Sequence, residues 1–299
     1  MARTRVVAGS ISWVSQKVTD YKLLVKFRLT LTVVFSALMA FFIASKDGVN
    51  PTAVLILAMG GFFVTGAANA LNQVLEKDYD KLMKRTADRP LAAGRMAVSE
   101  AVLAAGLMAM TGIMLLALFN VWAAFFGMLS LVAYAFLYTP LKRYSTMAIP
   151  VGAVPGALPM LIGCVAAEGE LTQLAFVLFA IQFAWQFPHF WSIGWLGYDD
   201  YKLAGYKMLP ERDGERDPRT GIYAAVYALL LIPLGFTLPW MGVTSWNPAI
   251  FVAILSLAYS ALGWNLYRKQ DRKAALQLMF GSLLYLPIVL VVYYLDILL

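Results

Sequence analysis

Long apolar runs alternate with short polar segments along nearly the whole chain. Nine of these runs approach or exceed the roughly 20 residues that a helix needs to cross a bilayer. They cover residues 24–45, 52–75, 98–118, 120–138, 148–167, 172–196, 221–241, 248–267 and 275–296. The pattern predicts an all-α polytopic membrane protein with nine transmembrane helices. We expect residues 1–299 to form a single domain, in which residues 1–21 are an N-terminal segment on the inner side.

The composition agrees with a membrane protein. Hydrophobic residues make up 61% of the chain and charged residues 14%, whereas soluble domains have about 45–50% and about 25%. The single cysteine, Cys164, excludes an internal disulfide. Arg3 and Arg5 are not followed by a compact apolar core and a cleavage site, so we expect no signal peptide and favour a bacterial protein.

The distribution of positive charge predicts the orientation. With the N-terminus inside, 23 of the 24 Lys and Arg residues fall on the inner side, and only Lys46 falls outside. Such asymmetry is typical of the cytoplasmic loops of membrane proteins. The net charge of +7 therefore reflects topology and attraction to anionic lipid headgroups, and it is no indication of nucleic-acid binding.

A candidate metal site lies at the inner end of the second apolar run. Asn72, Glu76 and Asp80 are spaced i, i+4, i+8, which places them on one face if the helix continues through them. Their oxygens are hard ligands that suit Mg²⁺. Arg85 and Arg89 follow and could bind phosphate. A diphosphate site is the functional interpretation, and a solvated helix end with simple ion pairs is the alternative.

Two further inner segments carry candidate residues. The segment that ends the fourth run contributes Lys142 and Arg143, either to phosphate binding or to ordinary anchoring at the membrane surface. The loop 197–219 contains six carboxylates and five cations, and the candidates among them are Asp199, Asp200, Lys202 and Lys207. An even number of spans separates this loop from the Asn72–Asp80 motif, so both should emerge on the same face.

The fifth and sixth apolar runs predict a polar cavity inside the bundle. Pro155 and Pro159 interrupt the fifth run, and broken helices are tolerated where they line a cavity or are covered by protein. Gln182, Gln186 and His189 share one face of the sixth run. Intramembrane polar residues are usually functional, and an imidazole beside aromatic walls would suit a tetrapyrrole. The alternative is a histidine that only packs in the core.

Five short motifs together resemble the UbiA superfamily of intramembrane prenyltransferases and, within it, the branch that farnesylates protohaem IX. The resemblance extends from about Lys22 to the last apolar run. The motifs are N-x-x-x-[DE]-x-x-x-D at residues 72–80, R-T-x-x-R-P-L at 85–91, Y-T-P-x-K-R at 138–143, P-H-F at 188–190 and D-Y-x-x-A-G-x-x-M-L-P at 200–210.

The resemblance implies a Mg²⁺-dependent enzyme of the UbiA fold with a central cavity opening to the inner face. Its reaction would join the farnesyl group of farnesyl diphosphate to the 2-vinyl group of protohaem, with addition of water, giving haem O and diphosphate. The enzyme would lie in the bacterial cytoplasmic membrane, with the active site on the cytoplasmic side. Haem A synthase or oxidase assembly proteins become candidate protein partners.

The same resemblance and the residue chemistry together assign candidate roles. The metal ligands would be Asn72, Glu76, Asp80, Asp199 and Asp200. The diphosphate would bind Arg85, Arg89, Lys142, Arg143, Lys202 and Lys207. Haem would contact Gln182, Gln186 and His189. The residues expected to matter most for catalysis are Asn72, Glu76, Asp80, Lys142 and Asp200.

The chain departs from the superfamily pattern at two points. Glu76 stands where an aspartate is usual, and the second D-x-x-x-D pair is missing because its ends fall on Gly197 and Tyr201. Three alternatives stay open: a prenyltransferase for a quinone precursor or another lipid acceptor, a transporter or channel, and a structural assembly factor. A transporter would need polar groups across the whole membrane depth, whereas here they gather toward one face.

Overall fold

The computed structural model describes residues 14–45 and 48–299, and Arg3, Arg5 and Lys46 lie outside these ranges. Within them, nine helical segments are long and apolar enough to cross a membrane. They are α2 (Phe27–Ala44), α3 (Pro51–Asp80), α4 (Val98–Ala117), a composite fourth span (Val121–Leu141), α7 (Ala148–Glu168), α8 (Gln173–Leu196), α10 (Thr220–Trp240), α11 (Trp246–Lys269) and α12 (Arg272–Leu298). Each overlaps one predicted span, so the expected nine-helix architecture is confirmed.

The fourth span changes its helical form toward its C-terminal end. It begins as α5 (Val121–Val132), continues as the π-helix η1 (Ala133–Tyr138) and closes with the single turn α6 (Thr139–Leu141). A π-turn is wider than an α-turn and is frequent at functional sites. The hydroxyl of Thr139 donates to the Tyr134 carbonyl at 2.8 Å, which satisfies a backbone oxygen inside the widened turn.

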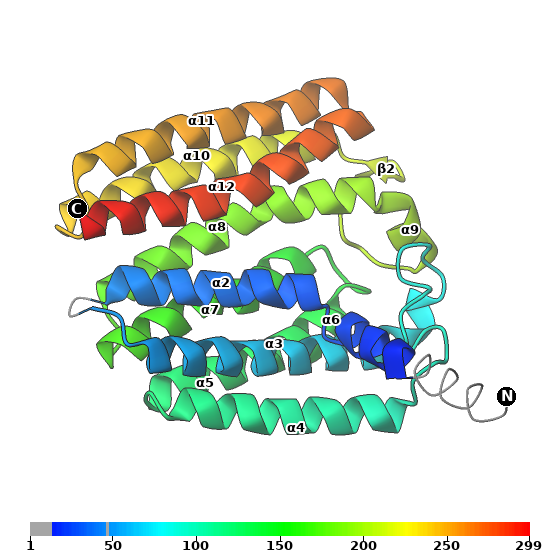
Figure 1. Ribbon diagram of the computed structural model, residues 1–299. Helices are drawn as coiled ribbons and strands as arrows, with labels where there is room; N and C mark the ends of the chain where they lie inside the picture. The colour runs from blue at the N-terminus through cyan, green and yellow to red at the C-terminus, as the bar shows by residue number, and fades with distance from the viewer. Residues whose placement is uncertain (1–13, 46–47) are drawn as a thin grey trace, which may run out of the picture.

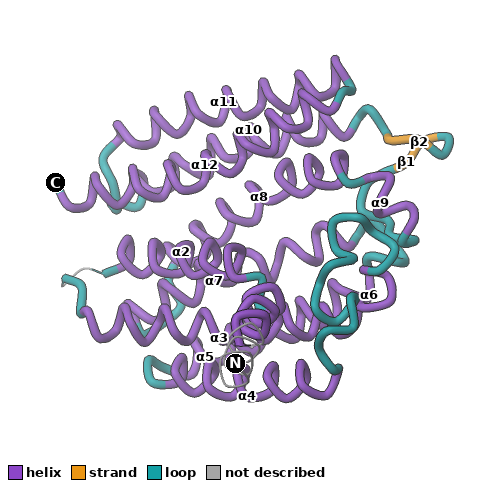
Figure 2. Tube along the Cα trace, turned by 45° about the vertical axis from the view of Figure 1, so that its right-hand side comes forward, coloured by secondary structure: helices purple, strands orange, loops and turns teal. Residues whose placement is uncertain are grey.

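The elements that do not cross the bundle lie together at one end of it. Figure 1 shows α9 (Tyr198–Leu203) and β2 (Glu215–Arg216) at the end opposite the C-terminus, and Figure 2 shows loops gathered there as well. β2 pairs antiparallel with β1 (Glu211–Arg212). The turn between them uses positive φ at Asp213 (54°) and Gly214 (80°), as a tight two-residue hairpin requires.

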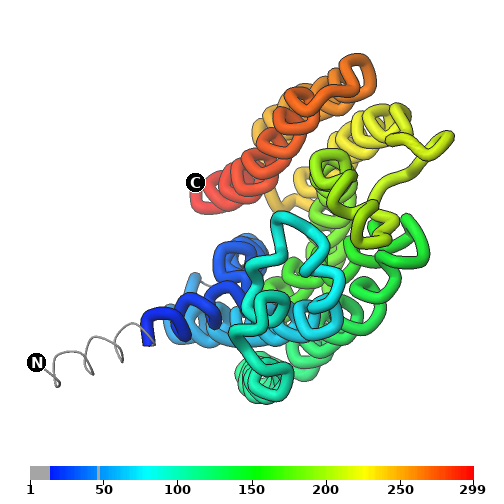
Figure 3. The backbone as a smooth tube through the Cα atoms, turned by 90° about the vertical axis from the view of Figure 1, so that its right-hand side faces the viewer, coloured from blue at the N-terminus to red at the C-terminus, as the bar shows by residue number. Residues whose placement is uncertain are grey.

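Helix α7 occupies the centre of the bundle. It packs against α2, α5 and α8, and 78% of its apolar stretch is buried, compared with 22% for α4 at the periphery. Gly163 allows close approach, since a Cβ there would overlap the Ala37 carbonyl oxygen of α2. Figure 3 looks along the bundle onto the loops, with the connection that follows α3 lying across the middle.

Candidate active site

Helix α3 carries the first set of polar residues into the protein interior. It continues without interruption to Asp80, so Asn72, Glu76 and Asp80 do share one face. Their relative exposures are 0%, 5% and 1%, which rules out a solvated helix end. Buried carboxylates are stable only when they are paired. Accordingly, Glu76 Oε1 lies 2.7 Å from Lys142 Nζ, and Arg89 donates from Nη1 to both oxygens of Asp80, at 2.7 and 2.8 Å.

The connection after α3 folds back so that Arg89 reaches both carboxylates. The Thr86 hydroxyl donates to the Asp80 carbonyl at 2.9 Å and thereby closes the first turn of this connection. Arg89 Nη1 lies 2.7 Å from Asp80 Oδ2 and 3.9 Å from Glu76 Oε2. The two carboxylates therefore converge on one position, which a positive charge occupies.

Lys26 is a residue of this site that the sequence analysis did not select. It has left-handed backbone angles, φ 48° and ψ 56°, directly before α2, a conformation that is strained for a residue other than glycine and is often found at functional sites. Its Nζ donates to Asn72 Oδ1 at 2.7 Å and to the Tyr134 hydroxyl at 3.3 Å. A lysine inside an apolar run was the available signal, because such residues are expensive to bury.

Asn72 itself lies behind the cavity. Its Oδ1 accepts from Lys26, and its Nδ2 donates to Thr139 Oγ1 at 2.9 Å. Asn72 therefore holds Lys26 in place and connects α2, α3 and the fourth span. Glu76 and Asp80 line the cavity, whereas Asn72 does not.

Aromatic side chains surround the Lys142 ammonium group. Lys142 Nζ lies 4.4 Å from the centre of the Tyr138 ring and 5.9 Å from that of Tyr206. Burial raises the pKa of the Tyr206 hydroxyl, so this group remains a hydrogen-bond donor. Its oxygen is buried and has no hydrogen-bond partner among the described residues. The Tyr206 side chain also lines the cavity, together with Glu76 and Lys142.

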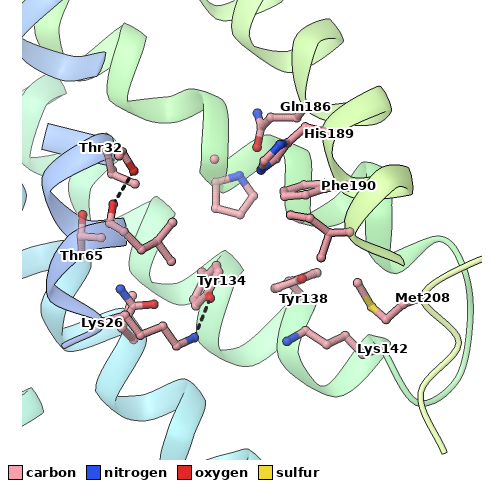
Figure 4. Close-up of a pocket in the computed structure, with 18 of the residues that line it drawn as sticks. Lys26, Thr32, Thr65, Tyr134, Tyr138, Lys142, Gln186, His189, Phe190 and Met208 are labelled. Atoms are coloured by element: carbon pink, nitrogen blue, oxygen red, sulfur yellow. Dashed lines mark hydrogen bonds between the residues drawn. The ribbon is translucent and has the colours of Figure 1, made fainter. Parts of the chain in front are cut away.

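One cavity of about 670 Å³ joins these charged groups to the membrane interior. Four cations and two carboxylates line it, namely Lys26, Arg85, Arg89, Lys142, Glu76 and Asp80. The cavity then continues between α2, α7, α8 and α12. Figure 4 shows Lys26, Tyr134 and Lys142 on one side of it, with Gln186 and His189 on the other. Its volume is in the range of ligand-binding cavities, about 300–1,000 Å³.

The two glutamines connect α8 to α7 in the wall of this cavity. Gln182 Nε2 donates to the Gly156 carbonyl at 2.6 Å, and Gln186 Nε2 donates to the Ala153 carbonyl at 3.0 Å. A Cβ at Gly156 would overlap Gln186 Oε1, so any larger residue there would require the Gln186 side chain to move. The Gln182 Oε1 atom is buried without a partner among the described residues, so it is a free acceptor in the wall.

His189 lines the same cavity from α8. Its Nδ1 lies 2.7 Å from Ser282 Oγ on α12. The Trp185 ring stacks on the imidazole at 5.1 Å with an interplanar angle of 13°. All three haem-binding candidates, Gln182, Gln186 and His189, thus lie in the wall of one cavity.

Several of the predicted phosphate-binding residues lie elsewhere. Arg85 lines the cavity and donates to the Tyr201 hydroxyl at 3.1 Å. Arg143 instead bonds to the Tyr79 hydroxyl and is not part of the cavity lining. Lys202 and Lys207 are exposed and do not line the cavity.

The second acidic pair is also outside the cavity lining. The Asp199 side chain is 81% exposed and pairs with Arg216 at 2.8 Å, and Asp200 does not line the cavity. Tyr201, at a position where the superfamily has an acid, lines it instead. Loop 197–219 therefore contributes aromatic side chains to the cavity, and the carboxylates of the cavity come from α3.

The residues that are present suit Mg²⁺ bound together with a substrate. No group of three or more His, Cys, Asp and Glu side chains is positioned for a metal ion in the described part of the chain. Mg²⁺ is commonly bound by one or two carboxylates together with substrate phosphates and water. Glu76 and Asp80 supply two such carboxylates close together, on either side of the Arg89 guanidinium group, which now fills the position between them.

Comparison with known proteins identifies the family of this chain. The model of the UbiA prenyltransferase family matches residues 33–284. A protein of Cytophaga hutchinsonii named protoheme IX farnesyltransferase is 44% identical, covering 92% of this chain and 96% of its own. One of the same name from Flavobacterium johnsoniae is 41% identical, covering 93% and 94%.

Solved structures show the same fold at low identity. A digeranylgeranylglyceryl phosphate synthase superposes with a TM-score of 0.77 at 17% identity, covering 95% of this chain and all of its own. A UbiA homologue from Archaeoglobus fulgidus, bound to DMAPP and Mg²⁺, superposes with a TM-score of 0.69 at 14% identity, covering 94% and 99%.

A nine-helix bundle around a cavity of this kind is the architecture of an intramembrane prenyltransferase. The chain belongs to the UbiA prenyltransferase family. The fold class and the enzyme class predicted from the sequence are therefore confirmed, and family membership sets aside the transporter and the assembly factor.

Proposed function

We propose that this enzyme transfers the farnesyl group of farnesyl diphosphate to the 2-vinyl group of protohaem IX, giving haem O and diphosphate. The observation that carries the proposal is a single cavity that joins the charged groups around Glu76 to His189. A prenyl diphosphate and a tetrapyrrole could therefore meet inside the protein. The names of the relatives from Cytophaga and Flavobacterium support this acceptor.

The cations of the cavity bind and neutralise the leaving group. Four of them face two carboxylates, which leaves an excess of positive charge for a diphosphate. Mg²⁺, when bound between the diphosphate and the carboxylates of Glu76 and Asp80, would supply further charge stabilisation as a Lewis acid. Groups already fixed around the site stabilise developing charge without reorganisation. Lys142 and Arg89 are fixed in this way by their carboxylate partners.

The apolar part of the cavity keeps water away from the farnesyl cation. The bond between farnesyl C1 and the diphosphate oxygen breaks, and early attack by water would give farnesol. The rings of Tyr134 and Tyr138 line the cavity beside Lys26 and Lys142, and aromatic faces can stabilise a cation. The terminal carbon of the haem vinyl group then bonds to C1, water adds to the inner vinyl carbon, and one proton is released.

The acceptor lies against α8 in this proposal. His189 ligates the haem iron, and the wall formed by Gln182 and Gln186 limits how far the macrocycle moves toward α7. Asp200, Arg143, Lys202 and Lys207 line no part of the cavity, so any role of theirs would need movement of their loops when substrate binds.

The reaction is tested with the purified protein, farnesyl diphosphate, haem and Mg²⁺. We expect a haem product whose mass increases by one farnesyl group and one hydroxyl group. A quinone precursor offered alongside haem is the competing acceptor. Prenylation of the quinone precursor with haem unchanged would instead favour the alternative prenyltransferase.

We propose further that the loop-rich end of the bundle faces the cytoplasm of a bacterium. Cysteines introduced by Glu215→Cys in the hairpin and Glu170→Cys after α7 would lie at opposite ends of the bundle, and both positions are exposed. The native Cys164 is buried and should not react. An impermeant thiol reagent added to intact cells should label the Glu170→Cys variant alone. Labelling of the Glu215→Cys variant alone would reverse the orientation.

A further inference from the structure

A buried serine on α12 contacts the only histidine of the chain. Ser282 has 0% exposure, and its Oγ lies 2.7 Å from His189 Nδ1. The same hydroxyl donates its proton to the Met279 carbonyl one turn earlier in the helix. Ser282 is therefore placed between a ring nitrogen and a carbonyl oxygen that can only accept.

This arrangement determines which ring nitrogen of His189 carries the proton. A serine hydroxyl has one proton, and here that proton is directed at the Met279 carbonyl. The short contact to Nδ1 is then favourable only if Nδ1 bears a hydrogen and donates to Ser282 Oγ. A second ring proton would create a charge between the Trp185 and Phe190 rings, and no carboxylate of the described residues contacts the imidazole there. The lone pair is consequently on Nε2.

The Nε2 atom is open to the cavity. His189 lines the cavity, and Nε2 makes no hydrogen bond to any described residue, yet it is not among the buried atoms that lack a partner. Neutral imidazole with a free Nε2 is the form that ligates haem iron, and such ligands usually donate their other N–H to a neighbouring acceptor.

Trp185 adds a second constraint on the same unit. It stacks on the imidazole, and its Nε1 donates to the Ser282 backbone carbonyl at 2.8 Å. The ring plane of His189 is thereby fixed by one face contact and one edge contact. The edge contact is made by Ser282 itself, and the Trp185 ring that makes the face contact is held by the Ser282 carbonyl. The position of α12 against α8 therefore sets the direction of Nε2.

We propose that Ser282 is a positioning residue that holds His189 in the Nδ1–H tautomer and directs Nε2 at the iron of the bound haem acceptor. The inference rests on the proposed function for the identity of the acceptor. It adds a residue that does not touch the reacting atoms and acts only through the imidazole.

The test compares haem binding by full-length variants in lipid nanodiscs. Ferrous haem is titrated, and the iron–imidazole stretch is recorded by resonance Raman spectroscopy. Ser282→Ala should weaken haem binding about 10- to 100-fold, the usual effect of removing a partner that orients a metal ligand, and should lower the frequency of the stretch. The near-isosteric Ser282→Cys preserves the volume of the side chain. If the alanine variant does not fold, haem affinity and the stretch are measured in the cysteine variant instead.

Ser256→Ala is the matched control. Ser256 is also a fully buried serine, bonded to the Val252 carbonyl of its own helix and to the Tyr285 hydroxyl at 2.7 Å, and neither of these partners is His189. It should bind haem as the unmodified protein does. His189→Ala should lose the stretch altogether, with farnesyl diphosphate binding little changed.

Three results would overturn the inference. These are a normal stretch and affinity in Ser282→Ala or, if that variant does not fold, in Ser282→Cys; an equal loss in Ser256→Ala; and an unmodified protein whose haem shows no histidine ligand. Failure of the proposed function would give a different result from failure of this inference. In that case haem would be bound through His189 with the expected dependence on Ser282, and no farnesylated haem would form.

Discussion

Glu76→Gln and Asp80→Asn are each expected to lower turnover by about 100- to 1,000-fold, the typical effect of removing one preorganised electrostatic group from an active site. The two amides keep the shape of the carboxylates, so packing around α3 should persist. They remove the negative charge on which Arg89 and Lys142 converge and at which Mg²⁺ would bind. Turnover is measured from the rate of haem product formation, with protein levels in the membrane checked in parallel.

Asp199→Asn is the control for this prediction. The sequence makes Asp199 a candidate metal ligand in the same way, yet its carboxylate is exposed and pairs with Arg216 outside the cavity. Substitutions at such surface positions usually change the free energy of unfolding by about 0.5 kcal/mol or less. Because the Asp199 carboxylate also lies outside the cavity, turnover should stay within about twofold. Normal turnover in both α3 variants, or an equal loss in Asp199→Asn, would contradict the assignment of the diphosphate site to α3.

The transmembrane helices could be predicted from the sequence because the bilayer imposes a one-dimensional requirement. Each crossing needs a run of apolar residues, and the runs can be counted without knowing how the helices pack. The apolar runs do not reveal whether a given segment is an α-helix or a π-helix. The fourth span contains the π-helix η1, which depends on contacts such as that between Thr139 and the Tyr134 carbonyl.

The α3 part of the site was also predictable, because helical spacing alone brings Glu76 and Asp80 to one face. Loop residues are different. Lys202 and Lys207 lie close in sequence to Tyr201 and Tyr206, which line the cavity, but they point elsewhere. Which side of an irregular loop faces inward is decided by tertiary packing and is not encoded in a fixed period.

Lys26 and Ser282 were missed for a related reason. Lys26 looked like a topology signal at the edge of an apolar run, and its role depends on a left-handed backbone conformation that turns it toward Asn72. Ser282 looked like an ordinary small residue in a helix, and its contact with His189 joins residues 93 positions apart. Both roles arise from contacts between helices distant in sequence.

Lys142→Met is expected to reduce turnover by about 100- to 1,000-fold, because it removes a fixed positive charge from the position where the diphosphate leaves. Lys202→Met and Lys207→Met should each stay within about twofold, since neither exposed side chain lines the cavity. The comparison is made on initial rates at saturating farnesyl diphosphate. A larger effect at Lys202 or Lys207 than at Lys142 would show that the loop, rather than the bundle, binds the diphosphate.

A double variant separates the chemical role of Lys142 from its structural one. Lys142→Met alone removes the ammonium group that lies 2.7 Å from Glu76 Oε1, so the carboxylate stays buried without this partner and the protein should unfold at a lower temperature. Adding Glu76→Gln removes the unpaired charge, and thermal stability should recover toward that of the unmodified protein. Turnover should not recover, because the cation and the carboxylate are both needed when the diphosphate departs. Recovery of turnover together with stability would mean that the buried pair only supports the fold.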